Sequence, residues 1–244
     1  MDKASEFNLS TARACLQASA YVYQHDCAIA SDLAHGALLD SPENQVLAFR
    51  GTACLRDWMT DVLVKRTSLM DGMKVHTGFW EAFISVMDQV LAAGKRASKP
   101  LFITGHSLGG AMAVLAARAI VRNGWQVAGV YTFGGPRIGN AAFARSYDML
   151  LGRQTFRIID EEDIVGRLPS WVFGWRHVGQ EIFLPSIGHD YLVNPSIVHK
   201  LISDVWGTVR HWKLDHEVAQ VRDHSCEAYQ KRLAEVQFVQ EVSA

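Results

Sequence analysis

One segment near the middle of the chain restricts the fold more than any other. The apolar residues 100–103 precede Gly-His-Ser-Leu-Gly-Gly at 105–110, and an apolar, alanine-rich run over 111–121 follows. This order predicts a buried strand, a tight turn and a helix. Because Gly105 and Gly109 lack a Cβ atom, strand and helix can approach closely there, with Ser107 on the turn between them.

A serine in this position has a specific chemical use. On a Gly-x-Ser-x-Gly turn between a strand and a helix, the hydroxyl projects from the sheet edge as a nucleophile. The backbone N–H of Leu108 opens the helix and can stabilise an oxyanion beside Ser107. A glycine-rich turn without chemistry has the same outline, and a phosphate-binding turn would continue with Lys-Ser/Thr, which is missing here. We therefore interpret Ser107 as a nucleophile.

Strands and helices alternate along the rest of the chain. Strands are predicted at 36–39, 45–49, 127–133, 155–159 and 177–184, and helices at 9–34, 81–93, 141–151, from 194 onward and 227–239. Such alternation is typical of a mainly parallel sheet with helices on both faces. The chain has 244 residues, of which 49% are hydrophobic and 20% charged, enough for one sizeable core. We expect a single α/β domain over residues 1–244.

Charge and cysteine content exclude several classes of protein. The formal net charge of -1 does not suggest a polyanion such as nucleic acid as a partner. The first residues lack the pattern of a secretory signal, and no apolar run is long enough to span a bilayer. The four cysteines form neither a CxxC pair nor a zinc-binding spacing, which indicates free thiols in a reducing compartment. We expect a cytoplasmic location, with export by another route left open, and no bound metal.

The segment after the strand over 45–49 offers a second oxyanion donor. In an α/β hydrolase this donor follows an early strand, and Thr52 stands there, although threonine also caps helices well. Apolar residues then recur at helical spacing, at Leu55, Trp58, Met59 and Val62. This short amphipathic helix is either a lid over the site or a helix permanently docked on the core, and amphipathicity predicts both equally.

A serine nucleophile needs a base and a group that orients the base. In an α/β hydrolase these follow the serine in the order carboxylate, then histidine. Four carboxylates leave the strand over 155–159, and both Asp160 and Asp163 are placed to orient a histidine. His224 lies in a loop before the last predicted helix, after the sheet is complete, where a base returning to the nucleophile is expected.

Together these motifs resemble the class 3, fungal-type triacylglycerol lipases, which have the α/β-hydrolase fold. The matching segments, in chain order, are 49–52, 76–79, 105–110, 131–140, 163–169, 176–179 and 223–224. The resemblance implies that Ser107 is the nucleophile, that Asp163 rather than Asp160 is the acid, and that His224 is the base. It also implies an oxyanion hole of Thr52 and Leu108.

The resemblance carries further expectations. It implies that the helix after Thr52, with Leu55, Trp58, Met59 and Val62, is a short helical lid over a mainly parallel sheet. The chain departs from the family at Gly166, where proline is frequent, and in lacking the signal and disulfides of the secreted fungal members. The predicted helical insert over 195–221 has no counterpart that we can match.

The function that follows is hydrolysis of carboxylic esters of acylglycerols or related lipids through an acyl-enzyme. No metal or organic cofactor is required. The partner is then a lipid or ester substrate at a membrane or lipid-droplet interface, and no oligomeric state is predicted. Alternatives are a phospholipase A1, an aryl or feruloyl esterase or an acyltransferase of the same fold, and a catalytically silent interaction protein.

Overall fold

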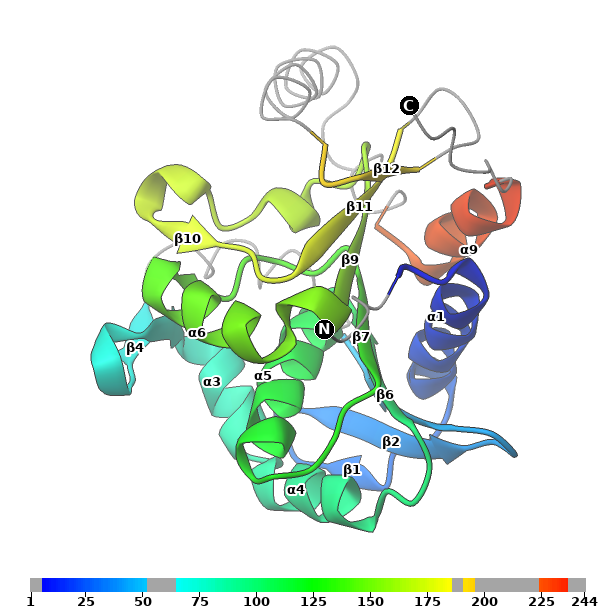
Figure 1. Ribbon diagram of the computed structural model, residues 1–244, viewed down its shortest axis with the longest axis horizontal. Helices are drawn as coiled ribbons and strands as arrows, with labels where there is room; N and C mark the ends of the chain where they lie inside the picture. Colours follow the sequence, from blue (N-terminus) through cyan, green and yellow to red (C-terminus); the bar gives the residue numbers. More distant parts are fainter. Residues whose placement is uncertain (1–5, 52–64, 186–190, 196–223, 237–244) are drawn as a thin grey trace.

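A mainly parallel sheet forms the centre of the computed structural model, which describes residues 6–51, 65–185, 191–195 and 224–236. Its eight strands follow the order β1-β2-β3-β6-β7-β9-β11-β12 (Figure 1). Their bounds are β1 Ile29–Ala30, β2 His35–Asp40, β3 Gln45–Phe49, β6 Leu101–His106, β7 Gly129–Phe133, β9 Thr155–Asp160, β11 Gln180–Leu184 and β12 Leu192–Val193. The strands from β3 to β11 are parallel, and antiparallel strands lie at both edges.

Helices cover both faces of this sheet, as predicted (Figure 1). Their bounds are α1 Leu9–Gln24, α3 Thr77–Ile84, α4 Met87–Arg96, α5 Leu108–Arg122, α6 Ala141–Leu151 and α9 Cys226–Glu235. The apolar residues of α1 and α9 pack on one face, and those of α3, α4, α5 and α6 pack on the other. Every residue of β7 and β9 is buried, because helices keep both faces of these strands from water.

Three predicted helices differ from the structure. The helix predicted over 227–239 ends at Glu235, where Val236 adopts an extended conformation. The helix predicted over 9–34 ends at Gln24, where His25 adopts an extended conformation, and β1 follows. The helix predicted over 81–93 begins earlier, at Thr77, and breaks between Ile84 and Met87 into α3 and α4. Asn194 lies in the described part, and the rest of the helix predicted from 194 lies outside the described residues.

A second, antiparallel sheet in the order β10-β8-β5-β4 was not predicted. Its strands are β4 Arg66–Ser68, β5 Lys74–His76, β8 Gly139–Asn140 and β10 Trp175–Arg176. Strands of two or three residues are too short to show an alternating pattern, so only the fold reveals them. The predicted strand over 177–184 accordingly begins only at Gln180, after β10 has ended.

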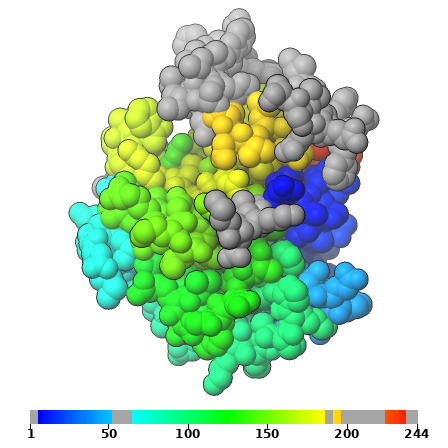
Figure 2. All heavy atoms as spheres, viewed as in Figure 1, coloured from blue at the N-terminus to red at the C-terminus, as the bar shows by residue number. Residues whose placement is uncertain are grey.

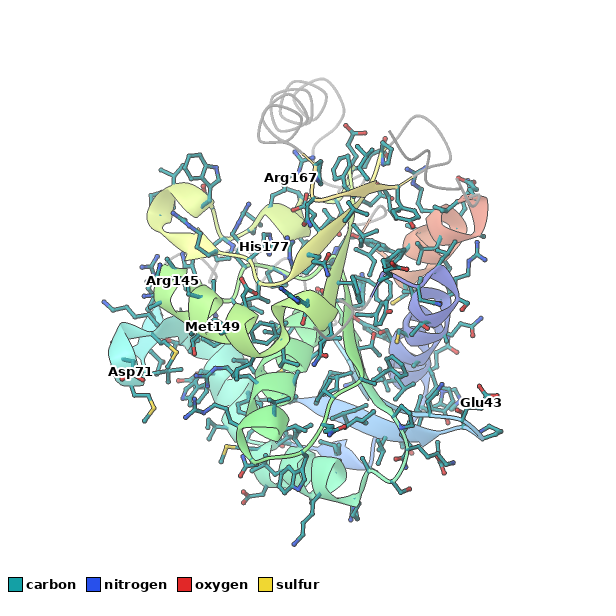
Figure 3. All side chains as sticks on the ribbon, in the orientation of Figure 1. Glu43, Asp71, Arg145, Met149, Arg167 and His177 are labelled. Carbon is teal, nitrogen blue, oxygen red and sulfur yellow. The ribbon has the colours of Figure 1, made fainter. Side chains whose placement is uncertain are left out.

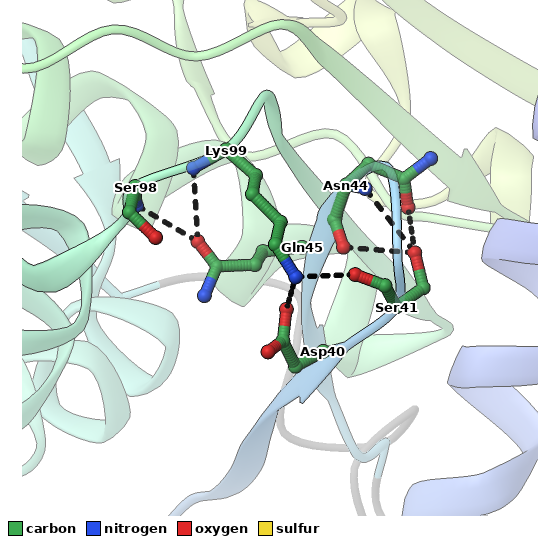
Figure 4. Close-up of polar contacts among 6 residues, drawn as sticks. All are labelled: Asp40, Ser41, Asn44, Gln45, Ser98 and Lys99. Carbon is green, nitrogen blue, oxygen red and sulfur yellow. Dashed lines mark hydrogen bonds and ion pairs between the residues drawn. The ribbon is translucent and has the colours of Figure 1, made fainter.

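The turn between β2 and β3 is tied to the residues that precede β6 (Figure 4). The Ser41 hydroxyl donates to the Asn44 carbonyl oxygen at 2.9 Å, which closes the turn. Lys99 Nζ donates to an Asp40 carboxylate oxygen at 2.8 Å, and Ser98 N donates to Gln45 Oε1 at 3.0 Å. These contacts fix the end of the sheet opposite to the carboxyl ends of the parallel strands.

Candidate active site

Ser107 stands on a strained turn between β6 and α5. Its backbone has φ 59° and ψ -129°, a combination that a residue with a side chain rarely adopts. The Ser107 N–H donates to the Phe133 carbonyl oxygen at 2.9 Å, which ties the turn to the end of β7. Leu108 is the first residue of α5, so its N–H has no carbonyl partner within the helix.

The two glycines beside Ser107 are required by the close approach of three backbone segments. A Cβ atom at Gly105 would overlap the Gly109 carbonyl group, and a Cβ atom at Gly109 would overlap the Phe49 carbonyl oxygen. The expectation that glycine lets the strand and helix approach is therefore confirmed. The contact with Phe49 adds a constraint that the motif did not reveal, because it joins the turn to β3.

Asp163 is fully buried and accepts three hydrogen bonds. The Val165 N–H donates to Oδ1 at 2.8 Å. His224 Nδ1 lies 2.7 Å from Oδ2, and the Tyr229 hydroxyl donates to the same oxygen at 2.7 Å. A buried carboxylate is costly unless its oxygens are hydrogen-bonded, and these donors provide that. Sequence reasoning missed Tyr229, whose only signal was its position in the helix that follows His224.

Asp160 occupies a different environment. It lies at the end of β9, accepts from the Glu162 N–H at 3.1 Å, and pairs with Arg232 Nε at 3.1 Å. Burial raises the pKa of the Asp160 carboxyl to about 6, although Arg232 and the Glu162 N–H act in the opposite direction. Strand position alone did not decide which of the two carboxylates orients the histidine. The structure distinguishes them, because Asp163 is the one that is hydrogen-bonded to His224.

His224 directs its second ring nitrogen away from Asp163. It lies just before α9, whose N-terminus is capped by the Ser225 hydroxyl accepting from the Ala228 N–H at 3.0 Å. With Nδ1 facing Asp163, His224 Nε2 remains buried without a hydrogen-bond partner among the described residues. Ser107 Oγ is buried and unpartnered in the same way. Among the described residues, the site therefore contains a free hydroxyl on Ser107 and a free ring nitrogen on His224, and Nε2 of the adjacent His106 is also buried and unpartnered.

His106 lies next to both Ser107 and His224. It precedes Ser107, and its ring centroid lies 4.5 Å from that of His224. Its Nδ1 lies 3.1 Å from the Tyr23 hydroxyl, which also accepts from the Gly51 N–H at 3.1 Å. Burial and the adjacent His224 lower the pKa of His106 to about 3, so the ring is neutral near pH 7. Sequence reasoning assigned no role to His106 or Tyr23.

Gly134 lies between the acid and the base. Its φ is 57°, and a Cβ atom there would overlap Asp163 Oδ2 and lie 2.8 Å from Cε1 of His224. Sequence analysis included this glycine only in the matching segment 131–140, yet Asp163 and His224 can pack this closely against the backbone only because residue 134 lacks a Cβ atom. Another histidine, His177, lies outside this cluster, with Nε2 2.8 Å from the Gly166 carbonyl oxygen (Figure 3).

The remaining predicted site residues lie outside the described part of the chain. These are Thr52 and the predicted lid residues Leu55, Trp58, Met59 and Val62. Within the described part, no three His, Cys, Asp or Glu side chains gather as they would around a metal ion. Among the same residues, no helix has both the length and the apolar character needed to cross a membrane. Cys15, Cys27 and Cys226 are free thiols, and Cys54 is not described.

Comparison with known proteins identifies the family. The family described as "Lipase (class 3)" matches residues 46–173, just over half of the chain. This chain belongs to the class 3 lipase family. The predicted resemblance and the α/β-hydrolase fold are confirmed.

Fungal lipases are among the similar proteins. The chain is 37% identical over 158 residues to secreted mono- and diacylglycerol lipase 1 of Fusarium solani, covering 61% of this chain and 47% of that protein. It is 33% identical over 156 residues to a lipase of Rhizomucor miehei, covering 59% and 43% respectively. This class 3 lipase chain thus spans about half the length of the curated relatives that it matches.

Solved structures give the same assignment. The structure of a lipase from Rhizopus microsporus var. chinensis matches with a TM-score of 0.62 at 28% identity, covering 76% of this chain and 77% of that one. A triacylglycerol lipase whose catalytic centre is described as a serine protease triad matches with a TM-score of 0.61 at 29% identity, covering 71% and 78%.

The expected cytoplasmic location of this class 3 lipase chain is wrong by the same comparison. The relatives from Fusarium solani and Penicillium cyclopium are named as secreted lipases. Lack of a visible signal and of a disulfide pattern was the basis of the expectation. The names of these secreted relatives contradict a cytoplasmic location, so the expectation is withdrawn.

Proposed function

We propose that this chain is a serine hydrolase that cleaves carboxylic ester bonds of acylglycerols or related lipid esters through an acyl-enzyme. One observation carries the proposal. Asp163 holds His224 at 2.7 Å through Nδ1, which leaves His224 Nε2 and the Ser107 hydroxyl as two buried, unpartnered groups. Such a pair of atoms is what transfer of the serine proton to a histidine requires. In enzymes without substrate, the hydrogen bond between the serine hydroxyl and the histidine nitrogen is often long, and it shortens when substrate binds.

In the first step, Ser107 Oγ attacks the ester carbonyl carbon and its proton passes to His224 Nε2. Asp163 keeps the imidazole in the required tautomer and stabilises the imidazolium that forms. The negative charge that develops on the carbonyl oxygen is met by the Leu108 N–H at the start of α5, and Thr52 is the proposed second donor. A donor of this kind contributes about 3 kcal/mol.

The second half of the reaction regenerates the serine. The tetrahedral intermediate collapses, the alcohol leaves with the proton from His224, and an acyl group remains on Ser107. Water then attacks the acyl carbonyl and gives one proton to His224, and the carboxylic acid leaves as the Ser107 hydroxyl reforms. A neutral His106 next to the His224 ring supports this cycle, because a second positive charge there would oppose imidazolium formation.

The substrate class is proposed from the relatives. Two are named mono- and diacylglycerol lipases, which favours acylglycerols at a membrane or lipid-droplet interface. A phospholipase A1 of Oryza sativa, 28% identical over 220 residues and covering 73% of this chain, makes glycerophospholipids the second candidate. The proposed lid of Leu55, Trp58, Met59 and Val62 would govern the access of either substrate to Ser107.

We further propose one domain over residues 1–244, because the described helices all pack on one central sheet.

Replacing Ser107 by alanine tests the activity. We expect Ser107→Ala to fold normally yet lose hydrolysis of p-nitrophenyl esters by about a thousandfold or more. It should also lose labelling by a fluorophosphonate. Ser68→Ala, at an exposed serine of β4, is the matched control and should keep both. Full activity of folded Ser107→Ala would end the proposal. Comparing diacylglycerol with phosphatidylcholine as substrate then separates the two candidates.

A further inference from the structure

Three consecutive apolar side chains are exposed in the segment that follows the Asp163 loop. Trp171, Val172 and Phe173 form a 3₁₀ turn, η4 Trp171–Phe173, and are 52%, 68% and 64% exposed. Exposed apolar residues are usually scattered singly over a surface, so a contiguous set marks an interaction site. Figure 2 shows this yellow-green segment standing out at the rim of the molecule, and Figure 1 shows it leading into β10.

The turn is held firmly although its side chains are exposed. The Gly174 N–H donates to the Trp171 carbonyl oxygen at 2.9 Å, with Gly174 at φ 81°. Arg176 Nη1 donates to the same carbonyl oxygen at 2.9 Å. The Arg66 guanidinium donates to the Phe173 carbonyl oxygen and lies 4.4 Å from the centre of the buried Trp175 ring. The second sheet therefore presents the apolar turn as a fixed projection.

The base of this projection is positively charged. Among the described residues, neither Arg66 nor Arg176 forms an ion pair with a carboxylate. Lys65, which precedes Arg66 in the chain, is also exposed. Aromatic side chains with cations directly behind them suit a lipid surface, where rings enter the interface and cations meet phosphate groups. An apolar protein partner would explain the exposed turn, but it would not explain the two arginines behind it that form no ion pair within the described part of the chain.

We propose that the 171–173 turn inserts into the surface of a lipid aggregate that carries anionic phospholipid headgroups, with Arg66 and Arg176 facing the phosphates. The turn is joined to the candidate site by a short path. Asp163 lies in the loop that follows β9 and runs through Pro169 to the turn. Arg137, which follows β7, donates to the Pro169 carbonyl oxygen at 3.1 Å. Docking would thus hold the ester-cleaving site against the lipid. The proposal rests on the proposed function only in this last point.

Vesicle sedimentation tests the surface directly. The full chain is mixed with vesicles of phosphatidylcholine alone or with added phosphatidylglycerol, and the bound fraction is measured. We expect wild-type protein to bind the mixed vesicles more strongly. The double variant W171S/F173S should bind them at least about tenfold more weakly, because it removes two apolar side chains from the interface. Arg176→Gln should weaken only the part of binding that depends on phosphatidylglycerol.

Matched controls separate this surface from general hydrophobicity. Met149→Ser changes a residue of α6 that is 81% exposed (Figure 3), and Leu33→Ser changes one that is 57% exposed. Both should bind vesicles as wild type does. If W171S/F173S fails to fold, Val172→Ser gives the same test with one small change. Wild-type binding by the folded turn variants would overturn the proposal, as would gel filtration showing that the turn mediates self-association instead.

The experiment also distinguishes failure of this proposal from failure of the proposed function. Ser107→Ala should bind vesicles like wild type, because its hydroxyl lies in the buried site. W171S/F173S should hydrolyse a soluble short-chain ester at the wild-type rate, since among the described residues the hydrogen bonds of the turn join it to Arg66, Arg176 and its chain neighbours, and not to Ser107, Asp163 or His224. Vesicle binding without esterase activity would support the surface and reject the enzyme, and the reverse result would reject the surface alone.

Discussion

Gly134→Ala adds one methyl group between the two residues that would activate Ser107. The Cβ atom would overlap Asp163 Oδ2 and lie 2.9 Å from His224 Nδ1, the two atoms that form the 2.7 Å hydrogen bond. Carbon and oxygen atoms pack without strain only beyond about 3 Å, so the carboxylate or the imidazole must move by about 1 Å. A misplacement of this size costs about a hundredfold in rate.

The backbone contributes a second, separate cost. Alanine at a φ of 57° destabilises the fold by about 1–2 kcal/mol irrespective of its neighbours. Gly124→Ala isolates that cost, because Gly124 has a φ of 86° and no atom within 4 Å of the added Cβ position. Both variants should therefore lose similar backbone stability, while only Gly134→Ala disturbs Asp163 and His224. We expect kcat/KM to fall about a hundredfold or more for Gly134→Ala and to stay near wild type for Gly124→Ala.

The assay combines p-nitrophenyl ester kinetics with urea unfolding of each variant. The unfolding curve gives the folded fraction under assay conditions, and the rate is corrected for it. A corrected kcat/KM for Gly134→Ala within a factor of two of that for Gly124→Ala would refute the reasoning. It would mean that the Asp163–His224 contact described here is not the arrangement on which the activity depends.

Two further predictions concern the groups around that contact. Tyr229→Phe removes the hydroxyl that donates to Asp163 and accepts from the Asp160 N–H. The free energy of unfolding measured in urea should therefore fall by about 1.5–3 kcal/mol, and kcat should also fall. Unchanged stability and kcat would contradict this. His106 stays neutral when folded, with a pKa of about 3, but gains a proton below about pH 6.5 when unfolded, so its contribution to stability falls as pH falls. His106→Asn should therefore flatten the decline in unfolding free energy between pH 7 and pH 5 by about 2 kcal/mol, and a parallel decline in both proteins would exclude this role.

Local patterns predicted the elements that position Ser107 because each is specified by adjacent residues. The strand and helix on either side of the turn, and the helix over 141–151, were found where apolar periodicity, glycine and a capping residue agree. The helix predicted over 9–34 was wrong at its C-terminal end because no glycine or proline marks Gln24 as the last helical residue. The break between α3 and α4 is likewise unmarked, since apolar residues continue through it.

Local sequence patterns cannot predict contacts between residues that lie far apart in the chain. The choice between Asp160 and Asp163 depends on which carboxylate faces His224, and both follow the same strand. Periodicity has no information on that choice, and only the family resemblance favoured Asp163. Tyr229 and Tyr23 were missed for the same reason, because each acts through a residue far away in the chain. A tyrosine in a helix is ordinary core material until its hydroxyl is seen to have a partner.

The position of α9 shows how stability and the proposed chemistry are joined in this fold. Arg232 of α9 pairs with Asp160, and Tyr229 of the same helix donates to Asp163. On its other side the helix meets α1, where the Arg13 guanidinium donates to the Leu233 carbonyl oxygen at 2.7 Å. Since His224 directly precedes α9, any change that loosens the helix also moves the proposed base. The end of β9 and the loop after it therefore have two tasks: Asp163 orients the imidazole, and Asp160 and Asp163 anchor the helix that follows His224.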